Sequence, residues 1–89
     1  MPPADPAIAR WYADEVQPHE APLRAWLASR FPNLADADDI VQESVMRVLR
    51  ARGSGPILSP KSLLFVVARN LALNRLRDAQ RKPAQPLAD

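Results

Sequence analysis

The chain has 89 residues, of which 12 are Lys or Arg and 10 are Asp or Glu, with a formal net charge of +2 and no cysteine. This length predicts one small domain, and the absence of cysteine excludes disulfides and thiolate metal sites. The single histidine, His19, is too little for a histidine metal site, and no apolar run reaches the length of a membrane span. We therefore expect a soluble, cytoplasmic protein that contacts no membrane and uses no cofactor or metal.

The charges are distributed unevenly along the chain. Residues 36–43 contain four acids and no base, whereas residues 69–82 contain five bases and one acid, Asp78. A chain polarised in this way suggests two different partners, one anionic and one not.

Prolines divide the first third of the chain. Residues 1–6 are proline-rich, and we expect them to be disordered. Residues 7–17 can form a helix that Pro18 stops or kinks. Pro22 suits the first turn of a second helical stretch, which Pro32 ends. The apolar positions of the two stretches are Ile8, Trp11, Tyr12, Val16, Leu23, Trp26, Leu27 and Phe31.

The next helix is predicted over residues 36–52 and carries the acids. Asp36 is the expected N-cap, and the acids that follow it favour the positive end of the helix dipole. One face is apolar: Ala37, Ile40, Val41, Val45, Val48 and Leu49. The opposite face is polar except for its methionine: Asp39, Gln42, Glu43, Met46 and Arg50. Met46 is either a single exposed apolar residue, which is common, or part of a protein-binding surface, where methionines are often used.

The clearest break in the sequence is at residues 53–56, Gly-Ser-Gly-Pro. After it, Ser59 can cap a last helix with Pro60 as its first residue, and this helix can extend to Lys82. Residues 83–89 then resemble the start of an interdomain linker. No strand is predicted, so the fold class is all-α: a small bundle of three main helices over residues 7–82, the first of them kinked at its prolines.

The last helix has two faces of different chemistry. Its core side gathers Leu64, Val67, Ala68, Leu71 and Ala72. Roughly opposite lie Asn70, Asn74, Arg77 and Arg81, at steps of four, three and four residues. Amides and guanidiniums without an acid suit phosphates and base edges. Arg75 falls within the core arc, so we expect it to snorkel or to pair with an acid that the sequence does not specify.

Two strings on consecutive helices carry a family resemblance. Asp38-Asp39-Ile40-Val41-Gln42-Glu43, followed after a short loop by Leu64-Phe65-Val66-Val67-Ala68-Arg69-Asn70-Leu71-Ala72-Leu73-Asn74-Arg75-Leu76-Arg77, resembles conserved region 2 of bacterial sigma factors. The best agreement is with the extracytoplasmic-function group. The resemblance covers residues 11–82. Either string alone is weak, and their order and spacing together make the signal specific.

The resemblance implies two partners. In sigma factors the acidic helix docks on the coiled-coil clamp helices of the β′ subunit of RNA polymerase, which here assigns Asp39, Gln42 and Glu43 to that contact, with Met46 and Arg50 as neighbours. The last helix and the loop before it face the −10 promoter element, where the non-template strand is held single-stranded and one unstacked base enters a protein pocket.

The residues implied for DNA are on the last helix and its approach. Asn70, Asn74, Arg77 and Arg81 would bind the strand, Lys61 and Arg69 would be flanking phosphate contacts, and the loop of residues 51–59 would border the base pocket. Many relatives have tryptophan where this chain has Leu63. Sigma factors of this group also have a helix-turn-helix domain for the −35 element, and this chain stops in what resembles the linker to it. We expect a truncated form, with a natural short protein as the alternative.

Other functions fit the residues less well. A protein-only module that binds polymerase or an anti-sigma factor would keep the face with Asp39 but would not need Asn70 and Arg77. A duplex-binding regulator needs a short recognition helix after a tight turn, which this loop and long helix do not provide. An enzyme is not expected, because no nucleophile–base pair, metal cluster or phosphate-binding glycine loop is present. An anti-sigma factor is a further candidate partner.

Overall fold

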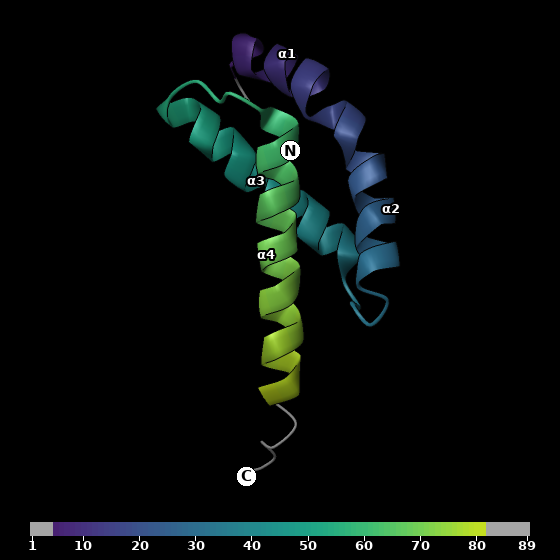
Figure 1. Ribbon diagram of the computed structural model, residues 1–89. Coiled ribbons are helices and arrows are strands. Elements are labelled where there is room, and N and C mark those ends of the chain that lie inside the picture. Colours follow the sequence, from purple (N-terminus) through teal and green to yellow (C-terminus); the bar gives the residue numbers. More distant parts are fainter. Residues whose placement is uncertain (1–4, 82–89) are drawn as a thin grey trace.

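The computed structural model describes residues 5–81, and this part of the chain contains helices and no strand (Figure 1). The expected all-α fold is confirmed. The elements in chain order are α1 (Pro6–Glu15), a short 3₁₀ helix (Gln17–His19), α2 (Glu20–Arg30), α3 (Ala37–Ser54) and α4 (Pro60–Arg81).

The first helix begins earlier than predicted. The Asp5 carboxylate accepts a hydrogen bond from the backbone N–H of Ala7 at 2.8 Å, and Pro6 occupies the first helical position. An aspartate cap followed by proline is a strong start signal. Pro6 therefore belongs to α1, with Asp5 as its N-cap, and neither is part of a disordered segment of residues 1–6. The rest of that segment, residues 1–4, lies outside the described residues.

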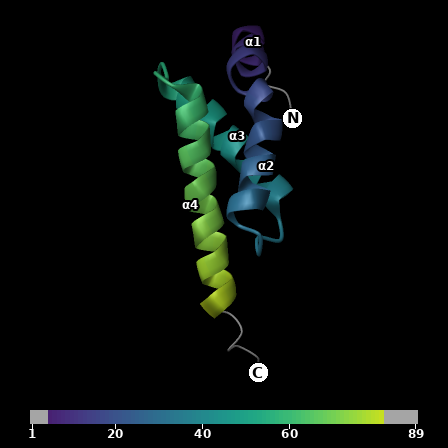
Figure 2. The same cartoon turned by 45° about the vertical axis from the view of Figure 1, so that its right-hand side comes forward.

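The predicted kink between the first two helical stretches is confirmed at Pro18. α1 ends at Glu15, two residues short of the expected end, and the 3₁₀ helix turns the chain before α2 starts. The Tyr12 hydroxyl donates a hydrogen bond to Glu20 across this turn. Burial, together with the bond to the Glu20 carboxylate, raises the pKa of Tyr12 to about 12. Val16, at the turn, is fully buried. α1 and α2 thus form one bent arm (Figure 2).

α3 is longer than the predicted helix of residues 36–52. Asp36 is at the N-cap position, where its carbonyl accepts a hydrogen bond from the Ile40 N–H at 3.1 Å, but its side chain makes no capping bond. The helix continues through Gly53 and Ser54. A single glycine in a helix costs only about 1 kcal/mol relative to alanine, so Gly53 does not end it. The connection to α4 is therefore residues 55–59.

α4 starts as the sequence predicts. Ser59 accepts a hydrogen bond on its carbonyl from the Leu63 N–H at 3.0 Å, and its hydroxyl accepts a longer one from the Ser62 N–H at 3.4 Å. The described helix ends at Arg81, so the expected end at Lys82 and the linker of residues 83–89 lie outside the described residues. Every side chain from Arg77 to Gln80 is exposed, and the end of α4 extends past the other helices (Figure 1).

The core lies where α3 crosses α4 and where α2 covers them both. α3 packs most extensively against α4, and α2 contacts both helices. Trp26 of α2 contacts Phe65 of α4 edge to face, with ring centroids 5.5 Å apart. The buried hydrophobic residues are Val16, Leu23, Leu27, Ile40, Val41, Val45, Val48, Leu64, Ala68, Leu71 and Ala72. The predicted core residues Ala37, Leu49 and Val67 are partly buried against this cluster.

One ion pair and one cation–π contact join the bent arm of α1 and α2 to α3 at the surface. Arg24 of α2 pairs with Asp38 near the start of α3. At the other end of α3, the Arg52 guanidinium lies over the Trp11 ring of α1, 5.5 Å from its centroid. The bent arm of α1 and α2 is therefore attached to both ends of α3.

Within residues 5–81, no helix combines the length and the apolar character needed to cross a membrane. The same residues contain no group of three His, Asp or Glu side chains that could hold a metal ion.

Candidate functional site

The outer face of α4 presents the amide and guanidinium groups that the sequence singled out. Asn70, Asn74 and Arg77 are all exposed. The Arg77 guanidinium donates a hydrogen bond to the Asn74 side-chain oxygen, one turn earlier on the helix. Arg81 lies in the last turn of α4, and its side chain is outside the described set. The three described residues thus form one polar surface on the side of α4 that faces away from α3.

Two exposed aliphatic residues share this surface, and the sequence analysis did not identify them. Val66 is 53% exposed and Leu73 is 39% exposed. At 100° per residue, both lie within about 60° of Asn70 around the helix axis. The helical periodicity that places Asn70, Asn74 and Arg77 on one face also places Val66 and Leu73 there, so the sequence could have predicted both. The face therefore combines hydrogen-bonding groups with apolar ones, a mixture that suits base edges and thymine methyl groups.

The two expected flanking cations are placed differently. Arg69 and Lys61 are both exposed. Arg69 is about 100° from Asn70 around the axis and borders the polar surface, whereas Lys61 is nine residues before Asn70 and so about half a turn away, on the opposite side. The structure brings Arg69 to the edge of the surface and separates Lys61 from it.

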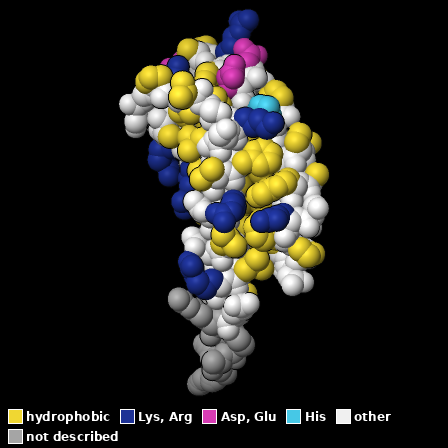
Figure 3. All heavy atoms as spheres, in the orientation of Figure 1, with side chains coloured by type: hydrophobic (Ala, Val, Ile, Leu, Met, Phe, Trp, Pro, Cys, Tyr) yellow, Lys and Arg dark blue, Asp and Glu magenta, His cyan; other side chains and the backbone are white. Residues whose placement is uncertain are grey.

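The space-filling view shows how charge is distributed on the side that α4 occupies. Lys and Arg side chains are scattered over the middle and lower part of this face, among hydrophobic side chains, and Asp and Glu side chains are visible only near the top, toward α1 (Figure 3). The face is therefore suited to an anionic partner.

The acidic face of α3 is also exposed as predicted. Asp39, Gln42, Met46 and Arg50 are exposed, and Glu43 is partly buried. Met46 is 45% exposed, which confirms an apolar residue within a polar surface. These five residues lie on the side of α3 opposite its buried residues Ile40, Val41 and Val48.

Arg75 of α4 reaches this acidic face. Its Nη2 atom lies 2.9 Å from Asp39 Oδ2 and 3.4 Å from Glu43 Oε1. The other Glu43 oxygen pairs with Arg47 at 2.8 Å. The hydrogen bond to Asp39 raises the pKa of Arg75, and the nearby charges of Asp39, Glu43 and Asp36 act in the same direction, while burial opposes them. The expectation that Arg75 pairs with an acid is confirmed, with two acids as partners. The sequence analysis did not single out Arg47.

The connection before α4 is shorter than the predicted loop of residues 51–59, because residues 51–54 belong to α3. Leu58 is fully exposed within it, at 102%. Ile57 and Leu63 are partly buried and pack against the core. Leu58 is therefore an apolar side chain of this connection that is open to solvent.

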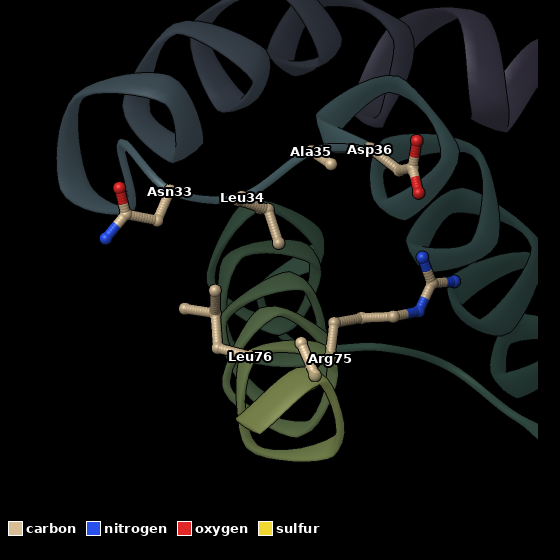
Figure 4. Close-up of a pocket in the computed structure, with 7 residues that line it drawn as sticks. Asn33, Leu34, Ala35, Asp36, Arg75 and Leu76 are labelled. Carbon is tan, nitrogen blue, oxygen red and sulfur yellow. The ribbon is translucent and has the colours of Figure 1, made fainter. Parts of the chain in front are cut away.

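A cavity of about 160 Å³ lies beside Arg75, between the α2–α3 connection and the last third of α4 (Figure 4). Leu34, Ala35, Leu76 and Ala79 give it apolar walls, and Asn33, Asp36 and Arg75 complete the lining. The Arg75 side chain extends along it with its guanidinium toward the Asp36 side (Figure 4).

Comparison with known proteins identifies the family. The family model described as sigma-70 region 2 matches residues 16–82. The chain belongs to the sigma-70 region 2 family. It is similar to the ferric citrate uptake sigma factor FecI of Escherichia coli strain K12, with 30% identity over 59 residues, which cover 66% of this chain and 34% of that protein. The chain thus spans about a third of the length of this relative. No solved structure matches it.

The sigma-70 region 2 match includes the whole candidate site. Residues 16–82 contain the acidic face of α3, the connection to α4 and the polar surface of α4. α1 ends at Glu15 and lies before the matched range. The family resemblance inferred from the two sequence strings is confirmed, and the roles of individual residues stay predictions.

Proposed function

We propose that this region 2 domain acts in transcription initiation: it docks on RNA polymerase through the acidic face of α3 and binds the non-template strand of the −10 promoter element through the outer face of α4. The observation that carries the proposal is the placement of two exposed faces of different chemistry on two helices that pack against each other. One rigid pair of helices can therefore hold a protein partner and a nucleic-acid partner at once.

The polymerase contact is assigned to α3. Asp39 is 66% exposed, and Gln42, Met46 and Arg50 are exposed on the same face. Carboxylates, an amide and a flexible thioether suit a mixed polar and basic protein surface. The family resemblance supports the clamp helices of the β′ subunit as that surface.

The DNA contact is assigned to Asn70, Asn74 and Arg77, with Arg69 at the edge. Opening a duplex step costs a few kcal/mol of lost pairing and stacking. A protein lowers this cost without any chemical step if it binds the open strand more tightly than the duplex. Side-chain amides can hydrogen-bond to the edges of unstacked bases, and arginines can hold the phosphates. Val66 and Leu73 add apolar contact for a base or a sugar.

A titration tests both assignments. The chain, with a clamp-helix fragment of polymerase present, is titrated against single-stranded non-template oligonucleotides of varied sequence. We expect sequence-selective binding that weakens in Asn70→Ala, because an exposed amide on α4 is lost. The matched control is Gln17→Ala, which removes an exposed amide from the 3₁₀ helix, away from α4.

A second candidate function is decided by the same titration. A protein-only module would bind the clamp fragment, show no preference among the oligonucleotides, and be insensitive to Asn70→Ala. Exposed Val66 and Leu73 are the observation that favours it, because aliphatic side chains on a helix also suit a protein partner. Clamp binding without DNA selectivity would therefore replace the promoter-binding proposal with this one.

A further inference from the structure

Arg75 links the two proposed binding faces. Its backbone is on α4, in the arc that faces α3, and its guanidinium contacts Asp39 and Glu43 on the proposed docking face. Asn70 and Arg77 lie about 140° and 160° away from it around the α4 axis. The same helix thus places two side chains toward the proposed DNA strand and a third into the acidic face of α3.

One nitrogen atom of Arg75 holds both carboxylates. Nη2 donates to Asp39 Oδ2 and to Glu43 Oε1. Asp39 and Glu43 are four residues apart on α3, where like charges repel, so a cation between them offsets that repulsion and restricts both side chains. Within residues 5–81, the second Asp39 oxygen, Oδ1, accepts no hydrogen bond from another side chain and stays open to a donor from outside.

The same contact contributes little to stability. The Arg75, Asp39 and Glu43 side chains are 36%, 66% and 37% exposed, and ion pairs this exposed to solvent are weak. Preorganisation has a larger effect on binding, because each side chain that is immobilised only on association lowers affinity. Arg75 removes that cost for two acids before the partner arrives.

We propose that Arg75 is a positioning residue: it holds Asp39 and Glu43 in the arrangement that binds a cationic segment of the partner and fixes this acidic face relative to the DNA-facing helix. The inference rests on the proposed docking function of α3. The partner that fits is a helix whose Lys or Arg side chains are spaced to reach Asp39 Oδ1 and the remaining polar groups of this face.

Simple charge counting predicts the opposite effect of removing Arg75. Without this cation the α3 face is more negative, so a cationic partner would be attracted more strongly. If Arg75 positions the acids, its removal frees both carboxylates and weakens binding. The sign of the change in affinity therefore separates the two interpretations.

The experiment measures the affinity of the chain for the clamp-helix fragment by fluorescence anisotropy, with circular dichroism to check helicity. From the ordering cost of two side chains we expect Arg75→Met to weaken binding about five- to tenfold, and Arg75→Lys to recover part of the loss. Arg10→Met is the matched control, because it removes one exposed ion-paired arginine from α1, where it contacts neither Asp39 nor Glu43. It should bind as the wild type.

A background without the two acids tests whether Arg75 affects binding through Asp39 and Glu43. If Arg75 acts through the two acids, Arg75→Met should have no further effect in an Asp39→Asn, Glu43→Gln background. Should Arg75→Met lose helicity, Arg75→Gln replaces it, since the shorter polar side chain is also neutral.

Two outcomes count against the inference in different ways. Wild-type affinity in a folded, neutral variant at position 75 overturns it and leaves the docking function standing. If the wild-type chain does not bind the fragment at all, the docking function itself is refuted, and the role of Arg75 falls with it.

Discussion

The salt dependence of DNA binding should identify the arginines of α4 that contact phosphates. Arg77 is exposed on the outer face, beside Asn74, whereas Arg75 is engaged with α3. Each phosphate contact on a single strand contributes about 0.7 to the slope of log affinity against log salt. Arg77→Ala should therefore flatten that slope by up to about 0.7.

The expected change is small but measurable. Between about 50 and 200 mM salt, one lost contact reduces the salt-induced fall in DNA affinity by a factor of about 2.6. The assay is fluorescence anisotropy of a labelled single-stranded oligonucleotide over a series of salt concentrations. We expect the chain without polymerase to bind DNA weakly, so protein concentrations must be high, or the clamp fragment must be present throughout.

The control must lose one positive charge at a different place. Arg10→Ala serves this purpose, because Arg10 is on α1 and its side chain is 84% exposed. It lowers the net charge by the same amount and should leave the slope unchanged, whereas Arg77→Ala should reduce it. Equal slopes in the two variants would mean that Arg77 contacts no phosphate and that α4 attracts DNA only through overall charge.

Two further predictions concern α3 and the bent arm. Asp39→Arg should abolish binding to the clamp fragment, because it reverses an exposed charge, and should keep its helicity by circular dichroism. The control, Asp14→Arg on α1, should bind normally. Binding by Asp39→Arg would contradict the docking proposal. The raised pKa of Tyr12, about 12 against an ordinary value of 10, means that its contribution to stability is complete below pH 10 and is lost as the pH rises toward about 12. The free energy of unfolding, measured in urea, should fall between about pH 10 and 12 in the wild type but not in Tyr12→Phe. The same pH dependence in both proteins would refute this reasoning.

The helices were predictable because their signals are local. Helix starts and ends are set within a few residues, by Ser59 with Pro60 and by the prolines at 18 and 22. The apolar periodicity of α3 and α4 is also a local pattern. The predicted end of α3 falls two residues early, because the Gly-Ser-Gly-Pro string is a strong turn signal but a single glycine does not end a helix, and Gly53 and Ser54 stay helical.

The candidate site was predictable only within each helix. Angular periodicity correctly placed Asn70, Asn74 and Arg77 on an exposed face, and it placed Arg75 in the core arc. It could not name Asp39 and Glu43 as the partners of Arg75, because the register between two helices depends on how their side chains interlock. Lys61 is exposed on another side of α4 from Asn70, and its role as a flanking phosphate contact, which the family resemblance implies, stays a prediction.

The projecting end of α4 has an energetic consequence. Up to Arg75 the helix is held by α3, but from Arg77 to Gln80 all side chains are exposed, so this turn depends on its own backbone hydrogen bonds. Such helix ends open locally at little cost. A nucleic-acid strand bound there would suppress that fraying. Ordering the helix end would then add an unfavourable entropy to the free energy of binding. α4 therefore combines a long part that α3 holds in a fixed direction with a short C-terminal turn that can adjust to the strand.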